Sequence, residues 1–308
     1  MRKTALNCVL EMARADERVC FVGSDLGCGV MDEFLAEMPN RIFREGISEQ
    51  HVIGLAAGLA LEGRIVYLNT IASFLTRRCL EQTVLDLCLH QAKVRLIGSG
   101  GGLVYAPLGP THLATDDFAL MRPLPNMTIL SPCDAEEMKR LMPQTLETPG
   151  PVYIRLAKGG DLVVSSAERS GPIGRAIPML GTEGPLNALF VTCGVMTQIA
   201  LTAAETLRNQ GQSVEVLHNH TVKPLDAEAL LKYAARSAAV FTVEEHVLTG
   251  GLGSAAAEIL AEAGWARLPR FQRLALPDAF FCEHGSQNEI LAAHGLTAAE
   301  LVRRVNGA

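Results

Sequence analysis

Apolar and polar positions along the chain follow two recurring patterns. Short runs rich in Val, Ile, Leu and aromatic residues, such as 64–72 (RIVYLNTIA) and 151–157 (PVYIRLA), are typical of buried strands. Longer segments with apolar residues three or four positions apart, such as 75–91 (LTRRCLEQTVLDLCLHQ), are typical of amphipathic helices. Because the two patterns alternate along the chain, they predict an α/β fold with parallel sheets.

The alternation occurs in two stretches, separated by an irregular segment rich in Gly, Ser and Pro. In the first stretch, strands are predicted at 18–25, 64–72, 93–100, 127–132 and 151–157, and helices at 30–38, 49–61, 75–91 and 133–147. In the second, strands are predicted at 188–194, 213–222, 238–247 and 270–278, and helices at 197–211, 226–237 and 250–264. We therefore expect two doubly wound, mainly parallel-sheet domains at 1–160 and 188–308, joined by a linker at 161–187.

The helix predicted at 49–61 is the most apolar of the set. From Val52 to Leu61 it contains only Val, Ile, Leu, Ala and Gly, so we expect it to be buried on nearly every side. Glu49 stands at its start, directly after Ser48. A carboxylate in the first turn can complement the helix dipole, or it can be a buried acid that hydrogen-bonds a ligand. This stretch alone favours the first interpretation.

Composition narrows the class of protein. Hydrophobic residues make up 48% of the 308 positions and charged residues 19%, which is enough for large cores. The net charge of -6, without a Lys/Arg block, argues against a nucleic-acid partner. The eight cysteines form no CxxC pair and are expected to be core residues in a reducing cytosol, neither disulfides nor a zinc site. The start of the chain is too charged for a signal peptide, and no run approaches the ~20 apolar residues of a membrane span, so we expect a cytoplasmic protein.

Three local motifs have both a structural and a functional interpretation. The GGLG turn at 250–253 opens a helix and could hold an anion there, but a tight strand-to-helix turn is favoured because the dinucleotide fingerprint is incomplete. In VEEH, ending at His246, neighbouring strand residues point to opposite faces, which argues against a metal site. His112, in the long loop after the strand at 93–100, is equally compatible with a plain loop contact and with a functional role.

The order of several longer motifs resembles the C-terminal half of transketolases. The first half carries VGSDLG, RIFREGISEQHVIGLAAGLALEG, NTIASFLTRRCLEQ, GPTHLATDDFALM and GPVYIRLAKGG, and the second carries CGVMTQIALTAAETL, VKPLDAEAL and VEEHVLTGGLG. The resemblance implies a pyrimidine-binding domain followed by a transketolase C-terminal domain. The family's GDG motif, which binds Mg²⁺ and the diphosphate of thiamine diphosphate, is absent. We therefore expect one subunit of a split transketolase that dimerises within a heterotetramer, with the partner chain supplying metal and diphosphate binding.

The resemblance assigns a catalytic role to two residues. Glu49 matches the family's Glu that bonds a ring nitrogen of the aminopyrimidine and shares a proton with it, and this context outweighs the capping interpretation. His112, in GPTH, matches a His that contacts the ketol hydroxyl of the substrate. The remaining matches are Asp25, Ile71, Phe74 and Arg77 near the cofactor, and Arg2 and Lys158 as contacts of the substrate phosphate. Ile71 and Arg77 stand where other members have aromatic residues, so the pocket is less aromatic.

The chain departs from the family at positions that grip a phosphosugar. Gly100 replaces a His, Leu108 replaces an Asp, and Gly29, or Cys28 with a one-residue shift, replaces a Ser. These changes remove hydrogen-bonding groups and add apolar surface and, through GSGGG, backbone freedom. They predict a less polar or bulkier acceptor than an ordinary aldose phosphate, and hence a specialised pathway.

Three other functions fit parts of the same pattern. The chain could be deoxyxylulose phosphate synthase-like, or the β subunit of a 2-oxoacid dehydrogenase decarboxylase component, although GPTH and SFLTRR favour transketolase over the latter. It could also be a catalytically silent regulatory subunit with the same fold. Glu49 argues against that, because a silent relative has no need of a buried acid.

Overall fold

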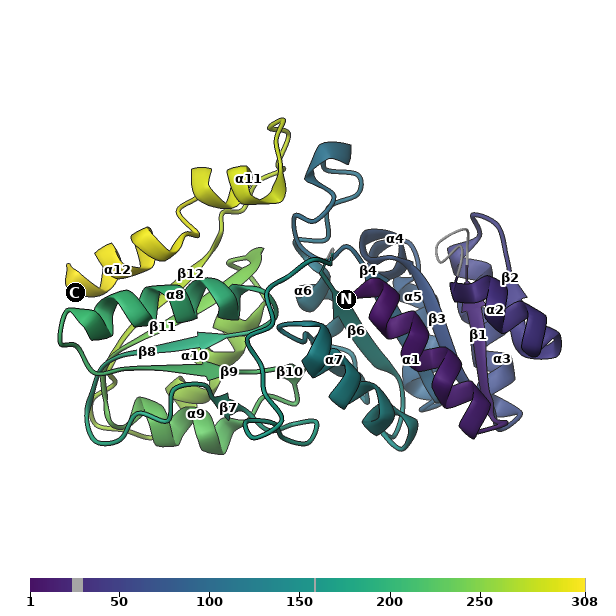
Figure 1. Cartoon of the computed structure of the whole chain (residues 1–308), viewed down its shortest axis with the longest axis horizontal. Helices are drawn as coiled ribbons and strands as arrows, with labels where there is room; N and C mark the ends of the chain where they lie inside the picture. Colours follow the sequence, from purple (N-terminus) through teal and green to yellow (C-terminus); the bar gives the residue numbers. More distant parts are fainter. Residues whose placement is uncertain (24–29, 158, 308) are drawn as a thin grey trace.

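The computed structural model describes residues 1–23, 30–157 and 159–307, which form two α/β units side by side along the long axis (Figure 1). The first is built on a seven-stranded sheet with the order β10-β5-β6-β4-β3-β1-β2. All its neighbouring strands are parallel except the β10–β5 pair. Its strands are β1 (Val19–Gly23), β2 (Ile42–Arg44), β3 (Ile65–Ile71), β4 (Val94–Ser99), β5 (Thr128–Leu130), β6 (Val152–Leu156) and β10 (Thr221–Lys223).

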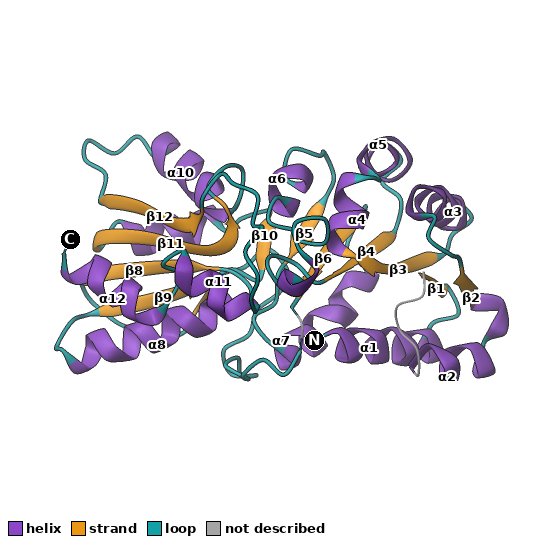
Figure 2. Ribbon diagram, turned by 90° about the horizontal axis from the view of Figure 1, so that it is seen from above, coloured by secondary structure: helices purple, strands orange, loops and turns teal. Residues whose placement is uncertain are grey.

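Helices cover both faces of this sheet (Figure 2). On one face, α1 (Arg2–Ala15), α2 (Val30–Glu37) and α7 (Ala135–Leu141) pack over Tyr67 and Ile97. On the other face lie α3 (Glu49–Leu61), α4 (Ala72–Arg77), α5 (Leu80–Gln82), a π-helical turn at Thr83–Leu89 and α6 (Asp117–Met121). Short 3-10 helices occur at Pro39–Arg41, Ala106–Leu108 and Met142–Leu146.

The second unit has a five-stranded sheet with the order β12-β11-β8-β9-β7. Its strands are β7 (Ile177–Pro178), β8 (Leu186–Thr192), β9 (Val214–His218), β11 (Ser237–Val247) and β12 (Arg270–Leu276), all parallel except β7. Its helices are α8 (Met196–Asn209), α9 (Ala227–Ala234), α10 (Leu252–Glu262), α11 (Gln287–Ala293) and α12 (Ala298–Asn306). The predicted fold class, two doubly wound and mainly parallel sheets, is confirmed.

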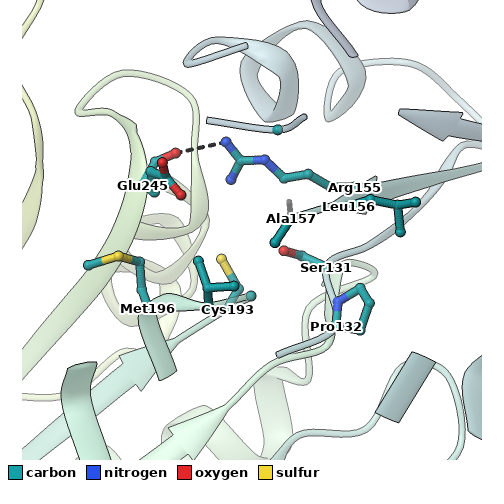
Figure 3. A pocket seen from close by; sticks show the side chains of 11 residues that line it. Ser131, Pro132, Arg155, Leu156, Ala157, Cys193, Met196 and Glu245 are labelled. Carbon is teal, nitrogen blue, oxygen red and sulfur yellow. Dashed lines mark hydrogen bonds between the residues drawn. The ribbon is translucent and has the colours of Figure 1, made fainter. Parts of the chain in front are cut away.

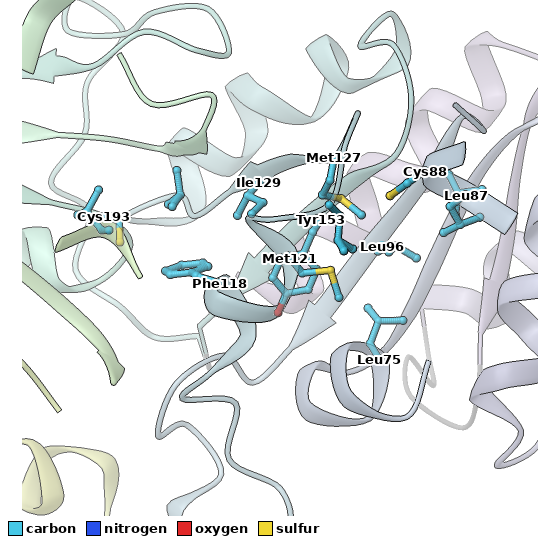
Figure 4. Packing of buried hydrophobic residues seen from close by; sticks show 14 of the residues in the cluster. Leu75, Leu87, Cys88, Leu96, Phe118, Met121, Met127, Ile129, Tyr153 and Cys193 are labelled. Atoms are coloured by element: carbon cyan, nitrogen blue, oxygen red, sulfur yellow. The ribbon is translucent and has the colours of Figure 1, made fainter. Parts of the chain in front are cut away.

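The two units share a core, and the strand β10, which follows a strand of the second sheet along the chain, pairs in the first sheet. The segment predicted as one strand at 213–222 is two strands, because the chain leaves the second sheet after His218 and pairs with β5 of the first sheet from Thr221. Phe118, Met121 and Tyr153 of the first unit belong to the same buried cluster as Cys193 of the second (Figure 4). The irregular segment before β8 also contributes, because β7 pairs with β9.

A buried ion pair lies where the units meet. The Nε of Arg155 is 3.0 Å from Oδ2 of Asp117, and Nη2 of Arg155 donates to the backbone oxygens of Glu245 and Ala114. Figure 3 shows Arg155 reaching across toward Glu245 beside a cavity of about 20 Å³, which has room for about one water molecule. Burial alone would lower the pKa of Arg155, but the carboxylates of Asp117 and Glu245 more than offset this and raise it.

Two predicted helices differ from the structure. The segment 75–91 is not one helix, because α4 ends at Arg77 and a π-helical turn follows α5. Helix α3 is not enclosed on all sides: Val52, Ile53, Ala56 and Ala57 pack inward, whereas Leu61 is 61% exposed. An all-apolar helix with one unburied face is typical of a surface that another chain covers.

The described cysteines form no disulfide with one another. None of the helices in the described part of the chain is long and apolar enough to span a lipid bilayer.

Candidate active site

The candidate site lies where β3 and β4 end and α3 and α4 begin. In parallel sheets, ligand sites form at the carboxyl ends of the strands. Ile71 ends β3, and α4 follows it directly, which brings Phe74 to this edge. The loop after β4 carries His112 to the same place. The resemblance to transketolases assigns Ile71 and Phe74 to the cofactor and His112 to the substrate, whereas the strand pattern alone predicts only that His112 lies in a loop after a strand.

Glu49 begins α3, and only 5% of its side chain is exposed. Ser48 is the N-cap residue and makes no side-chain cap bond. Among the described residues, the carboxylate of Glu49 bonds Arg78, whose Nη1 is 3.1 Å from Oε2. Glu289 shows how a capping acid behaves in this chain, since it is exposed and accepts the amide N–H of Ser286. Glu49 lies in the first turn of α3, where its charge complements the helix dipole, and its burial and side-chain partner distinguish it from Glu289.

The ring of Phe74 connects the other groups of the site. The Cζ atom of Arg78 lies 3.9 Å from the centroid of this ring. The ring of His112 also contacts this ring, with centroids 5.1 Å apart and planes inclined by 59°. We call these four residues, Glu49, Phe74, Arg78 and His112, the Glu49 pocket. A buried carboxylate beside an aromatic face can hold a planar heterocycle that carries ring nitrogens.

The thiol of Cys79 lies near the same carboxylate. Burial, and then the charge of Glu49, raise the pKa of Cys79 to about 12. Cys79 therefore stays a thiol at neutral pH and offers no nucleophile to the pocket.

Arg77 points away from Glu49. Its guanidinium forms a forked pair with Asp116 at 2.8 to 3.1 Å, and Nη1 also reaches the backbone oxygen of Pro110. Both contacts lie in the loop that carries His112, so Arg77 ties this loop to α4. Of the two adjacent arginines, it is Arg78 whose guanidinium contacts Glu49.

Arg2 lies at the start of α1, with Nη1 3.4 Å from the hydroxyl of Tyr105 in the loop after β4. This contact places it beside the loop on which His112 also lies. Asp25, Cys28, Gly29 and Lys158 lie outside the described residues.

The loop that begins at Gly100 is packed, which corrects the expectation of backbone freedom. A Cβ atom at Gly100, where φ is +80°, would overlap the ring of Tyr105. At Gly101 it would overlap Arg155, and at Gly102 it would overlap Glu245. These glycines are needed for close approach to neighbouring side chains. Leu108, by contrast, is exposed, as an apolar replacement in an open site would be.

The GGLG and VEEH motifs have structural roles. Glu244 accepts the amide N–H groups of Leu252 and Gly253, so the start of α10 already holds an internal carboxylate. His246 accepts the amide N–H of Ala119 at Nε2 and bonds the oxygen of Val247 through Nδ1. This motif forms no metal site among the described residues.

Arg78 is the residue of the pocket that we did not predict from sequence. It lies in the segment 75–91, which the apolar spacing predicts as one amphipathic helix. Arg78 is the C-cap residue of α4, one helical turn after Phe74, so its guanidinium can lie over that ring.

Comparison with known proteins covers nearly the whole chain. Residues 1–160 match the family model for the transketolase pyrimidine binding domain, and residues 185–301 match that for the transketolase C-terminal domain. The 6-deoxy-6-sulfo-D-fructose transketolase subunit SqwH of Clostridium sp. (strain MSTE9) is 37% identical over 98% of this chain and 92% of its own. A subunit of the apulose-4-phosphate transketolase of Phocaeicola vulgatus is 34% identical over 98% of this chain and 97% of its own.

Solved structures agree with these relatives. One described as a split gene transketolase, inactive beta4 tetramer, has a TM-score of 0.89 and 33% identity over 100% of this chain and 97% of its own. The Campylobacter jejuni transketolase has a TM-score of 0.79 at 17% identity, where 99% of this chain corresponds to 46% of the longer protein, and it shows the shared fold. In sequence and in structure, the chain belongs to the transketolase family.

Proposed function

We propose that the chain is one subunit of a two-chain, thiamine diphosphate-dependent transketolase. Such an enzyme moves a two-carbon ketol unit from a ketose donor to an aldehyde or another carbonyl acceptor. The observation that carries the proposal is Glu49, a buried carboxylate beside Phe74 in a chain of the transketolase family. The relatives from Clostridium sp. and Phocaeicola vulgatus are themselves named as transketolase subunits.

The described residues that the resemblance assigned to the site have parts in this proposal. Glu49 bonds a ring nitrogen of the aminopyrimidine and exchanges a proton with it. Phe74 packs on the ring, and Ile71 lines the pocket with an aliphatic side chain. His112, half-buried beside Phe74, contacts the ketol hydroxyl. The cofactor, when bound, supplies the electron sink for the transferred unit.

Arg77 contributes by position. Its pair with Asp116 holds the His112 loop against α4, which fixes the distance between His112 and Phe74. Asp25 would complete the cofactor site.

Mg²⁺ and the diphosphate are assigned to a partner subunit that carries the diphosphate-binding domain. Mg²⁺ prefers several oxygen ligands. Within the described ranges, one group has metal-ligand spacing, and it consists of Cys133, Glu137 and His218, buried at the boundary between the units. A thiol and an imidazole do not suit Mg²⁺, and Nε2 of His218 already bonds Glu137 at 2.8 Å.

The exposed side of α3 fits a contact between chains. Leu61 is 61% exposed, and in the adjoining π-helical turn Leu89 is 69% exposed. Two copies are proposed to dimerise through this unit within a heterotetramer, and the solved relative described as a β4 tetramer supports self-association. Light scattering is expected to show that Leu61→Lys with Leu89→Lys weakens assembly. Leu268→Lys, at an exposed leucine of the other unit, is the control.

The acceptor is proposed to differ from an ordinary aldose phosphate. Gly100 and Leu108 offer no side-chain hydrogen bond, and Arg2 and Lys158 are the proposed anion contacts.

A cavity of about 450 Å³, lined in part by Val104, Pro107 and Gly159, borders this region and can hold a sugar-sized group. The two relatives above are named for 6-deoxy-6-sulfo-D-fructose and for apulose 4-phosphate. A comparison of kcat/KM for ribose 5-phosphate and glyceraldehyde 3-phosphate with that for non-phosphorylated carbonyl acceptors tests this. A wide margin for the phosphosugars would contradict it.

A second candidate is 1-deoxy-D-xylulose-5-phosphate synthase-like chemistry. The enzyme of that name from Desulforudis audaxviator is 34% identical over 96% of this chain, which corresponds to 46% of its own length. Decarboxylation of pyruvate by the assembled enzyme would favour this candidate.

Calorimetry with thiamine diphosphate and Mg²⁺ tests the central proposal. The isolated chain is expected to bind the cofactor weakly, because it holds the pyrimidine side of the site. The complex with the partner subunit is expected to bind it tightly. Tight, Mg²⁺-dependent binding by the isolated chain would contradict the two-chain architecture.

A further inference from the structure

Arg78 lies in the Glu49 pocket, one helical turn after Phe74 along the chain. It follows the last residue of α4, and α5 starts two residues later, at Leu80. Its Cζ lies 3.9 Å from the centroid of Phe74 while its Nη1 lies 3.1 Å from Oε2 of Glu49. The side chain is 44% exposed, so it also has access to solvent.

The guanidinium group is planar, stacks on aromatic faces and donates in-plane N–H groups to a carboxylate. On the proposed function, the cofactor's planar ring packs on Phe74 and bonds Glu49. Both planar groups would therefore contact the Phe74 ring and the Glu49 carboxylate. We propose that Arg78 occupies the aminopyrimidine subsite of the cofactor-free chain and leaves it when the cofactor binds.

The hydrogen bonding of Glu49 favours this exchange. A guanidinium does not give up its proton, so the lone pair of Oε2 that accepts from Arg78 is not available to a ring nitrogen while that bond lasts. In the cofactor-free chain the same contact is useful, because an unpaired buried carboxylate is costly. Arg78 therefore satisfies the buried acid until the cofactor replaces it, and its open side gives it a route into solvent.

The exchange predicts that removing Arg78 tightens cofactor binding. The Kd of thiamine diphosphate, with Mg²⁺, is measured by calorimetry on the assembled two-chain enzyme. Arg78→Ala is expected to bind about three- to tenfold more tightly, because the cofactor no longer displaces a partly exposed ion pair and a cation–π contact. Arg18→Ala is the matched control: Arg18 is 48% exposed and paired with Asp16, but it precedes β1 at the opposite end of the sheet. Its Kd is expected to be unchanged.

An unchanged or weaker affinity in Arg78→Ala would overturn the exchange while leaving the proposed function in place. If neither the natural enzyme nor the variant binds thiamine diphosphate, both the function and the exchange are wrong.

A second measurement on the free chain needs no cofactor. Urea unfolding of Arg78→Ala, Glu49→Gln and the double variant forms a double-mutant cycle. Arg78→Ala is expected to lower the urea midpoint in the natural background and to have little effect when Glu49 is already Gln. Equal losses in both backgrounds would show that the two side chains do not interact and would overturn the proposal.

Discussion

In the described part of the chain, two arrangements have an arginine that pairs with a carboxylate and lies over a phenylalanine ring. At the boundary between the units, Arg155 is 7% exposed, contacts Asp117 through Nε at 3.0 Å and lies 4.4 Å above the ring of Phe118. In the Glu49 pocket, Arg78 is 44% exposed and makes one described hydrogen bond to Glu49. The same chemical groups thus occur once in a sealed interior and once in a site open to solvent.

The difference lies in how many partners each carboxylate has. Asp117 also accepts from the amide of Phe118 and from the hydroxyl of Tyr153, so its oxygens are engaged without Arg155. Burial, together with the charge of Asp117, raises the pKa of Tyr153 well above 10, so the hydroxyl keeps its proton. A network in which every polar group has a hydrogen-bond partner holds the two units against each other, whereas a single contact can be replaced by a contact with a ligand.

The largest expected effect is on turnover, at the open site. Glu49→Gln keeps the shape of the side chain but cannot exchange a proton, so kcat is expected to fall about 10²- to 10⁴-fold. Steady-state assays of the assembled enzyme measure this, and cofactor-bound samples allow proton exchange at the thiazolium carbon to be followed by NMR. Near-normal exchange in the variant would mean that Glu49 is structural, like Asp117.

The second effect is on stability, at the sealed pair. Arg155→Met keeps the length of the side chain but removes the cation beside Asp117 and one donor from each of two backbone oxygens. The free energy of unfolding is expected to fall by about 3–5 kcal/mol. Urea denaturation measures it. A loss below about 1 kcal/mol would show that the sealed pair is as replaceable as the open one.

The third effect concerns pH, again at the boundary. Burial lowers the pKa of His220 to about 4, although the carboxylate of Glu137 opposes the shift. In the unfolded chain His220 takes up its proton near pH 6.5, whereas in the folded chain it does so near pH 4. The contribution of neutral His220 to the free energy of unfolding is therefore fully present above pH 6.5. It decreases as the pH falls toward 4, by up to about 3 kcal/mol. His220→Gln is expected to flatten this part of the stability–pH curve. The exposed His90, changed to Gln, is the control.

Glu137 extends the acid sensitivity to lower pH. Burial alone would raise its pKa, but His218 and His220 more than offset this and lower it to about 2. The contribution of ionised Glu137 to the free energy of unfolding is present above about pH 4.3 and is lost as the pH falls toward 2. A curve for His220→Gln as steep between pH 6.5 and 4 as that of the natural chain would contradict the assignment to His220.

The smallest effect is on stability at the open pair. Arg78→Met removes a partly exposed ion pair, so the free energy of unfolding is expected to change by no more than about 1 kcal/mol. The same urea series that includes Arg155→Met measures it. Equal losses for the two variants would remove the distinction between the sealed and the open arrangement.

Periodicity predicted the two-sheet architecture because buried parallel strands are continuous apolar runs, as at β3 and β6. It did not predict that 213–222 divides between two sheets, because the apolar pattern is the same whichever sheet the residues enter. The final helices α11 and α12 were also missed, since our strand and helix assignments ended at β12.

For the site, the family's motifs located Glu49, Phe74 and His112, and the structure brings the rings of Phe74 and His112 together. The contact of Arg78 with Glu49 was not predicted, because the family's motifs offer a match for Arg77 and none for Arg78. The packing of the loop after β4 was missed for a related reason: a run of glycines looks the same whether it is loose or pressed against side chains.

Tyr105 limits how this chain could change its substrate over evolutionary time or in directed evolution. A His at position 100 would restore a phosphate contact, but its Cβ would overlap the Tyr105 ring, and the φ of +80° disfavours any side chain. The hydroxyl of Tyr105 lies next to Arg2, so removing the ring first also alters the neighbourhood of that arginine. Neither single change is expected to be beneficial alone. A protein with one of the two changes is therefore expected to be less active than this chain and than a protein with the common phosphosugar site.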